Sequence, residues 1–249
     1  MAQFVFKKAA ELIEKSKNEG FYENLSLEYN LKDLHSKFSL AAEKLFVPGP
    51  DENNLIEQFD RYFKLEDASL EEVRSRLLDE REYWGGANGV ASHTQINKQA
   101  DVVAMLSIFA NEYSTEVIRK NWEYYMPRTE HGSSLSACMF ATAACHIGKP
   151  DEAYPMFMKS ATADLTRGGK LWAGLLFIGG THPAASGGAW KVAVQGFSGI
   201  SVKNGEIIKR KPYLPQNWKS ISYKMQVGDK WYFVKSTNED TTLEEIKVD

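Results

Sequence analysis

The sequence has little cysteine, no long apolar run and no excess of basic residues. Its 249 residues include only two cysteines, Cys138 and Cys145. Two are too few for a disulfide framework and favour a reducing compartment. The longest apolar runs, such as residues 171–180, are far too short to cross a bilayer. The 30 Lys and Arg against 33 Asp and Glu argue against a nucleic-acid partner. Composition therefore predicts a cytoplasmic protein with neither a membrane nor a nucleic-acid partner.

Apolar residues recur at helical spacing through most of the first 200 residues. This pattern predicts helices over residues 3–17, 31–45, 70–83, 99–110, 114–124, 133–147, 151–164 and 188–197. Asn30 and Ser114 suit N-cap positions, and Gly148 suits a helix C-terminus. The helix over 133–147 is rich in Ser, Ala, Thr and Cys, and such small side chains let a neighbouring backbone approach closely. Residues 1–199 are therefore predicted to form a helical body.

The periodicity changes after Ile200. Residues 221–227 alternate apolar and polar, Gly228 and Asp229 suit a two-residue turn, and residues 231–234 are β-branched or aromatic. This pattern predicts a β-hairpin, which is marginal alone and must pack on helices or on strands that the chain does not supply. The tail at 238–245 is expected to be a frayed acidic end. Residues 200–249 are therefore predicted to form a small, incomplete β-sheet module.

Two loops that precede helices carry histidine and small residues. The first contains His131, Ser133 and Ser134, and the second, at 179–188, contains His182. Helix N-termini present unpaired N–H groups and a partial positive charge, which suit an oxyanion such as phosphate. The alternatives are that Ser133 is an N-cap, that His131 is a surface residue, and that the glycines of the second loop serve tight helix packing.

Lys98 and Gln99 stand at the start of the apolar helix over 99–110. They could supply hydrogen bonds to a ligand, or they could form an ordinary polar helix start. The histidines make no metal-binding pattern, and neither do the two cysteines, which stand seven residues apart on one face of a predicted helix. The acidic pairs at 51–52 and 57–60 are a weak indication of glycosyl chemistry, since such pairs are common on surfaces.

Four segments together resemble glycoside hydrolase family 65. They are residues 57–60, 97–103, 121–136 and 188–197, and their order and spacing make the resemblance specific. Members of this family are disaccharide phosphorylases that act on maltose, trehalose, kojibiose, nigerose and related α-glucosides. The resemblance implies a mainly α fold: the second half of an (α/α)6 barrel, followed by the start of a C-terminal β-sheet domain.

The resemblance also implies an inverting reaction, in which phosphate attacks the anomeric carbon opposite a general acid. Lys98 and Gln99 would bind the glucosyl unit. Ser133, Ser134 and His182 would hold phosphate, with His131 assisting, and β-glucose 1-phosphate would be released. No cofactor is implied beyond phosphate as co-substrate, and no metal.

The family's general acid is the Glu of a Gly-Pro-Asp-Glu-Tyr motif. Residues 49–52 match it, but Asn53 replaces the Tyr, and the motif stands five residues before Glu57, much closer than in the family. Glu52 is therefore interpreted as a coincidence, and the acid is expected upstream of Met1. No catalytic residue is assigned, and the chain alone is expected to be inactive.

Three alternatives remain open from the sequence. The chain could belong to an α-glucoside hydrolase of the same family, since some relatives use water. It could be a non-catalytic helical module that binds sugar or phosphate. It could also be a complementing fragment whose partner is the missing N-terminal half or a second copy in a homodimer. The sequence does not indicate which acceptor sugar is used.

Overall fold

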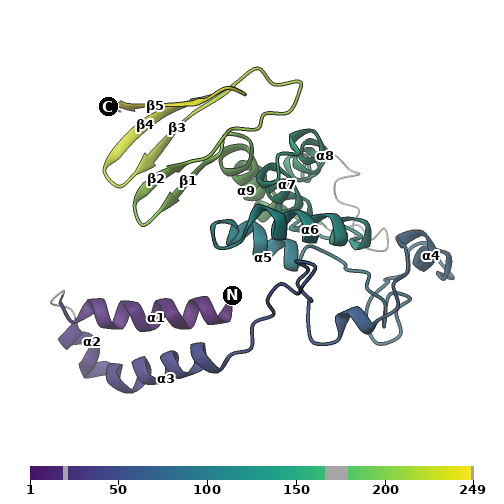
Figure 1. Ribbon diagram of the computed structural model, residues 1–249, viewed down its shortest axis with the longest axis horizontal. Coiled ribbons are helices and arrows are strands. Elements are labelled where there is room, and N and C mark those ends of the chain that lie inside the picture. Colours follow the sequence, from purple (N-terminus) through teal and green to yellow (C-terminus); the bar gives the residue numbers. More distant parts are fainter. Residues whose placement is uncertain (19–21, 166–178, 248–249) are drawn as a thin grey trace. The chain divides into compact units, whose positions relative to one another are not determined.

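The structure is a computed structural model, and it describes residues 1–18, 22–165 and 179–247. The chain divides into two compact units, Met1–Gly49 and Pro50–Asp249. The first contains the helices α1 (Ala2–Ser16), α2 (Tyr22–Glu28) and α3 (Leu31–Lys44), as Figure 1 shows. Helices α1 and α3 pack side by side through the stacked rings of Phe6 and Phe38, whose centroids are 5.9 Å apart. The predicted cap is confirmed, because the Asn30 side chain accepts a hydrogen bond from the Asp33 N–H.

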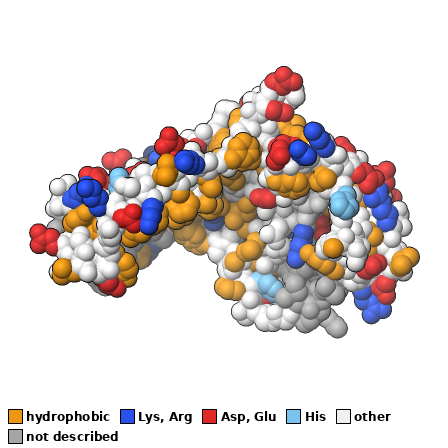
Figure 2. Space-filling model, turned by 90° about the horizontal axis from the view of Figure 1, so that it is seen from below, with side chains coloured by type: hydrophobic (Ala, Val, Ile, Leu, Met, Phe, Trp, Pro, Cys, Tyr) orange, Lys and Arg blue, Asp and Glu red, His pale blue; other side chains and the backbone are white. Residues whose placement is uncertain are grey.

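The first unit leaves many large apolar side chains in contact with solvent. Leu27 is 88% exposed and Phe46 is 77% exposed. Figure 2 shows hydrophobic side chains (orange) among charged ones on the face in view. Large exposed side chains of this unit also include Met1, Val5, Leu12 and Leu40. Apolar surface gathered in this way is typical of a face that packs against further protein.

The second unit holds the remaining helices. They are η1 (Tyr62–Lys64), α4 (Leu70–Ser75), α5 (Val102–Ile108), η2 (Ala110–Glu112), α6 (Thr115–Tyr125), η3 (Met126–Arg128), α7 (Ser136–His146), α8 (Pro150–Ala161), α9 (Pro183–Lys191) and the π-helical segment η6 (Val192–Phe197). The predicted helices exist, but α4, α5 and α7 are shorter than expected and α9 begins earlier. Ser114 caps α6 through the Val117 N–H, as predicted. Gly148 follows α7 with a φ of +74°, a left-handed conformation that favours glycine.

Helix α7 lies at the centre of the core of this unit. Its buried side chains are mostly Ala, Cys and Thr, and they contact α5, α6, α8, α9 and η6. A Cβ atom at Gly188 of α9 would lie 2.4 Å from the Sγ of Cys138, and one at Gly196 would lie 3.1 Å from the Sγ of Cys145. The expected close approach of backbones at small residues is thus confirmed, and so is the packing role of Gly188.

These two contacts also fix the direction of the neighbouring helices. Cys138 faces Gly188, and Cys145, later in the chain, faces Gly196, which is also later. Helix α7 therefore runs parallel to α9 and η6, and the N-termini of α7 and α9 lie at the same end of the pair (Figure 1).

Two antiparallel sheets follow the helices. Strands β1 (Ile200–Lys203) and β2 (Glu206–Lys209) form the first, and β3 (Ile221–Val227), β4 (Lys230–Ser236) and β5 (Thr241–Ile246) form the second, in that order. The predicted hairpin is confirmed as β3 and β4, with Val227 opposite Lys230. The expectation of a frayed tail is wrong, because β5 pairs with β4 along its length and places Leu243 opposite Val234. The chain thus supplies the third strand itself.

Buried polar contacts hold the sheets to the helical part of this unit. Arg210, which follows β2, donates from Nη1 to Nδ1 of His146 at 2.9 Å and from Nη2 to the Gln195 carbonyl. Ser198 bonds to Ser236, and the Trp218 ring packs on Phe197 with centroids 5.2 Å apart. Burial and the neighbouring Arg210 charge lower the pKa of His146 to about 3, so this imidazole is neutral and accepts from the guanidinium. The predicted division at residue 199, just before β1, stays a prediction as a domain boundary.

Candidate functional site

Backbone hydrogen bonds place the Lys98 segment beside the loop that contains His131. The Asn97 N–H donates to the Arg128 carbonyl at 2.7 Å, and the Gly132 N–H donates to the Lys98 carbonyl at 2.9 Å. Asn97 and Thr129 pair in parallel. The structure therefore brings together two clusters that lie more than thirty residues apart in sequence, Lys98 and the serine pair Ser133–Ser134.

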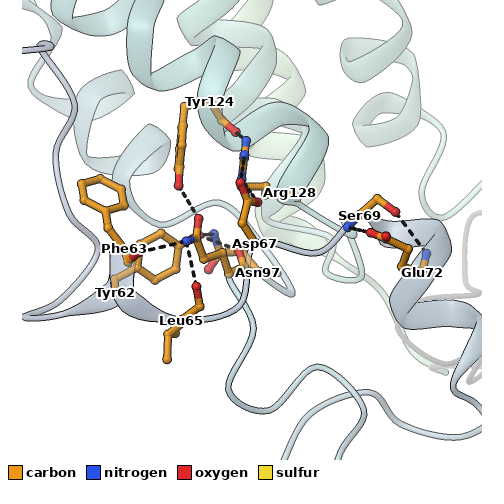
Figure 3. A network of polar contacts seen from close by, with 10 residues as sticks. Tyr62, Phe63, Leu65, Asp67, Ser69, Glu72, Asn97, Tyr124 and Arg128 are labelled. Atoms are coloured by element: carbon orange, nitrogen blue, oxygen red, sulfur yellow. Dashed lines mark hydrogen bonds and ion pairs between the residues drawn. The ribbon is translucent and has the colours of Figure 1, made fainter.

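The ion pair between Arg128 and Asp67 supports this arrangement (Figure 3). The Arg128 guanidinium donates from Nε and Nη2 to the two carboxylate oxygens of Asp67, at 2.8 and 2.6 Å. It also donates from Nη1 to the Tyr124 carbonyl and lies over the Tyr124 ring. These hydrogen bonds hold the pKa of Asp67 below its ordinary value. Arg128 thus fixes the segment at 128–129, whose Arg128 carbonyl accepts from the Asn97 N–H.

Amide side chains inside the same network hold the adjoining loop. The Gln95 Nε2 donates to the Leu65 carbonyl at 3.1 Å, and its Oε1 accepts from the Tyr124 hydroxyl. The Asn97 Nδ2 donates to the Tyr62 hydroxyl at 3.2 Å. Figure 3 shows these side chains converging from separate segments, with the capping box of Ser69 and Glu72 beside them. Buried amide side chains that are hydrogen-bonded in this way rigidify the segments that they join.

A cavity of about 350 Å³ opens beside Lys98. Its wall is rich in aromatic rings and includes Phe59, Tyr62, Tyr83, Trp84, Asn97, Lys98 and Glu130. The Lys98 Nζ lies 5.3 Å from the centroid of the Tyr83 ring. Rings with a few polar groups suit a sugar, whose C–H faces stack on aromatic side chains while its hydroxyls take hydrogen bonds. Gln99 is exposed next to Lys98 and does not line this cavity.

His131 is buried rather than at the surface, with 7% of its area exposed. Its backbone has a φ of +55°, and the Lys159 Nζ donates to its carbonyl at 3.1 Å. Its Nδ1 lies 2.8 Å from the Ser136 Oγ, which itself accepts from the Ala100 N–H. Burial lowers the pKa of His131 to about 4, so the ring is neutral at neutral pH. His131 therefore links the serine loop to the start of α5 as an uncharged group.

The serine pair immediately precedes α7. Leu135 occupies the N-cap position and makes no capping hydrogen bond with its side chain, so the interpretation of Ser133 as the N-cap is wrong. Ser133 instead accepts at Oγ from the Leu135 N–H, at 3.4 Å. Ser133 and Ser134 are both half-buried. First-turn N–H groups without a side-chain cap remain suited to an anion.

His182 occupies the N-cap position of α9, which also lacks a side-chain cap. Its Nδ1 lies 2.7 Å from Oδ1 of Asp164, and its backbone N–H donates to Oδ2 at 2.6 Å. Because α7 and α9 are parallel, this histidine and the serine pair lie at the same end of the two helices. The end of α8 connects them, since Lys159 contacts the His131 carbonyl and Asp164 contacts His182.

The sequence analysis assigned no role to Asp164, Lys159 or Ser136 in this site. Asp164 and His182 are separated by residues 166–178, which lie outside the described part of the chain, so no local spacing relates them. Ser136 resembles any serine of a small-residue helix. The packing of α8 against α7 and α9 brings Lys159 and Asp164 to the two loops.

Glu52 lies in an exposed turn away from these residues. The Asp51 Oδ1 accepts from the N–H groups of Asn53 and Leu55, at 2.9 and 2.8 Å, which closes the turn. Glu52 is exposed and does not line the cavity beside Lys98. Within residues 1–18, 22–165 and 179–247, no group of three or more His, Cys, Asp or Glu could hold a metal ion. Over the same residues, no helix is both long and apolar enough to span a bilayer.

The described residues thus form a mainly helical fold that ends in small sheets, with an aromatic cavity beside Lys98. Residues 1–191 match the profile of the glycosyl hydrolase family 65 central catalytic domain, and the chain belongs to this family. The predicted family and fold class are confirmed: the chain is mainly α and comprises part of the barrel followed by a small β-sheet module.

Relatives in this family are phosphorylases. The chain is 52% identical to nigerose phosphorylase from Lachnoclostridium phytofermentans over all of its own length and 33% of the relative's. It is 41% identical to 1,2-alpha-glucosylglycerol phosphorylase from Bacillus selenitireducens, over 80% of this chain and 26% of the relative. A solved structure named "Putative kojibiose phosphorylase from human microbiome" has 23% identity and a TM-score of 0.78, covering 98% of this chain and 33% of that one. The chain thus spans about one third of the length of these relatives.

Proposed function

We propose that this chain is the part of an inverting α-glucoside phosphorylase that binds the glucosyl unit and phosphate. The whole enzyme would transfer glucose from an α-linked disaccharide to phosphate and release β-glucose 1-phosphate. Two observations support the proposal: backbone hydrogen bonds place Lys98 beside the serine loop, and the parallel packing of α7 and α9 sets that loop and His182 at the same end of the two helices. Similar proteins include a nigerose phosphorylase and a kojibiose phosphorylase.

In this proposal, the cavity beside Lys98 receives the glucosyl unit. Tyr83 and Trp84 would stack on the sugar, and Lys98 with Gln99 would bind its hydroxyls. The position of Lys98 supports this role, because its Nζ stands over the Tyr83 ring at the cavity wall. Gln99, exposed beside it, would reach the sugar only from the cavity mouth.

Phosphate would bind at the end of the helix pair where the N-termini of α7 and α9 both lie. The proposed ligands are the Ser133 and Ser134 hydroxyls, first-turn N–H groups of α7, the Ala184 N–H of α9 (whose first residue, Pro183, carries no N–H), and His182. Both N-termini lack side-chain caps, and their dipoles favour an anion. His131 would assist as a neutral group through its link to Ser136.

We propose that the general acid is not among these 249 residues. Glu52, the residue that matches part of the family's acid motif, is exposed in a turn and lies outside the cavity lining. The relatives are about three times as long as this chain. In an inverting reaction the acid protonates the leaving oxygen while the nucleophile attacks from the opposite face. The chain described here would supply the phosphate side of that arrangement.

We further propose that α1, α2 and α3 pack against other helices of the barrel, whether on the same polypeptide or on a separately encoded half. The exposed apolar side chains of the first unit support this partner, since Leu27 and Phe46 have little contact within their own unit. A homodimer is the competing arrangement. Sedimentation of the chain alone and with the remainder of a family barrel distinguishes the two.

The decisive test has two parts. Calorimetric titration of the chain with β-glucose 1-phosphate should show binding that Lys98→Ala and Ser134→Ala each weaken about tenfold, whereas Lys203→Ala, at a lysine in β1, leaves it unchanged. Incubation with nigerose or kojibiose and phosphate should give no turnover. Phosphate-dependent turnover that disappears in Glu52→Gln contradicts the placement of the acid, and release of free glucose without phosphate favours the hydrolase.

A further inference from the structure

Asp164 directs both of its carboxylate oxygens at a single residue. Oδ1 lies 2.7 Å from the His182 Nδ1, and Oδ2 accepts from the His182 backbone N–H at 2.6 Å. The pair is largely shielded, with 11% of the histidine side chain and 22% of the aspartate side chain exposed. One carboxylate thus fixes both the imidazole and the backbone of the same residue.

This geometry decides which ring nitrogen carries the proton. A carboxylate accepts hydrogen bonds, so the nitrogen that faces it is Nδ1–H, and Nε2 is the nitrogen directed elsewhere. The second hydrogen bond holds the N-cap residue of α9, so the ring is oriented relative to the helix N-terminus itself. An acid that sets the tautomer and direction of a histidine has a large effect on what the histidine does, without contacting the ligand.

We propose that Asp164 is the positioning residue of His182: it holds Nδ1–H, so that Nε2, an acceptor in this tautomer, takes a hydrogen bond from the hydroxyl of hydrogen phosphate at the N-termini of α7 and α9. This inference rests on the proposed function, in which His182 contacts phosphate. A purely structural role is the competing explanation, because Ala163 packs on Ala185 and Asp164 joins α8 to α9 at the same place.

A double-mutant cycle separates these explanations. The dissociation constant for inorganic phosphate is measured by calorimetry for the unaltered chain, Asp164→Ala, His182→Ala and the double variant. If Asp164 acts through His182, each single change weakens binding about tenfold and the double variant binds no more weakly than His182→Ala. Asp151→Ala is the matched control, since Asp151 also accepts from a backbone N–H, that of Gln216, at the opposite end of α8. It should leave phosphate affinity unchanged.

The outcomes distinguish this inference from the proposed function. If phosphate binds and His182→Ala leaves its affinity unaltered, the phosphate role of His182 is wrong. If His182→Ala weakens binding but Asp164→Ala does not, or if the two effects add in the double variant, the positioning role is wrong. Urea unfolding of each variant shows whether a loss of affinity follows a loss of folding.

A second measurement needs no phosphate. Long-range ¹H–¹⁵N NMR spectra report which nitrogen of His182 is protonated. The unaltered chain should show the Nδ1–H tautomer, and Asp164→Ala should shift the ring to the Nε2–H tautomer that free histidine prefers. An Nε2–H tautomer in the unaltered chain would overturn the inference even if phosphate binds.

Discussion

Replacement of Gly188 by Ala tests the close packing of α7 against α9, on which the site depends. The new Cβ would lie 2.4 Å from the Sγ and 2.7 Å from the Cβ of Cys138. Ordinary carbon contacts are about 3.5–4.0 Å, so the helices must separate by roughly 1 Å. Overpacking of this kind costs about 1–3 kcal/mol. Rotation about χ1 of Cys138 moves Sγ but leaves Cβ in place, so it relieves only part of the clash.

Gly187 provides a matched control one residue away. A Cβ at this position meets nothing within 4 Å. Gly187→Ala should therefore stabilise the protein by about 0.5–1 kcal/mol, because alanine loses less conformational entropy in a helix than glycine. Because both variants gain this entropy term, they should differ by the packing cost alone, about 1–3 kcal/mol in the free energy of unfolding, which for a domain of this size corresponds to roughly 2–12 °C in Tm.

Urea and thermal unfolding followed by circular dichroism measure this difference. Phosphate affinity measured on the folded variants should also fall in Gly188→Ala, since the N-termini of α7 and α9 would no longer be held at their present separation. Equal stability of the two alanine variants would refute the close packing of α7 and α9. Loss of stability without loss of phosphate affinity would refute the link between this packing and the site.

Further predictions concern pH, the supporting ion pair and the third strand. The pKa values of His131 and His146 are lowered to about 4 and about 3. An unfolded histidine titrates near 6.5, so the unfolded state takes up protons first and stability falls as pH drops below 6.5. The loss should reach roughly 3 kcal/mol by pH 5.5, and His146→Gln should remove about half of it in urea titrations. Arg128→Lys, which cannot reproduce the paired hydrogen bonds to Asp67, should lower the unfolding free energy by about 1–2 kcal/mol, and an unchanged urea midpoint would contradict this. Deletion of residues 240–249 should destabilise β4 and speed amide hydrogen exchange at Val234. Unchanged exchange would instead indicate that the tail is frayed and does not pair with β4.

Local features of the sequence predicted the elements that depend on local chemistry. Asn30 and Ser114 were identified as caps because a side-chain oxygen can satisfy an N–H two or three residues later. The β3–β4 hairpin followed from the alternation and the Gly228 turn. Strand β5 was missed because Leu243 and Ile246 stand three residues apart with Glu244 and Glu245 between them, so its sequence lacks the period of two that marks a strand.

The sequence could indicate only those candidate site residues that precede a helix or belong to a recognisable motif. Lys98, the serine pair and His182 were predicted in this way, but the placement of their segments depends on packing that sequence spacing does not encode. The parallel contact of Gly188 with Cys138 sets the two helix N-termini at one end, and Asp164 reaches His182 across a long separation in sequence. The buried state of His131 was missed as well, because its partner Ser136 is an unremarkable helix residue.

The central claim is that the loop before α7 and the loop before α9 form a single phosphate site. Titration of the ¹⁵N-labelled chain with inorganic phosphate, followed in amide ¹H–¹⁵N spectra, tests it most directly. The account predicts shifts at both 132–136 and 182–185 that fit one dissociation constant. Shifts confined to one of these segments, two different constants, or no shift at either would contradict it.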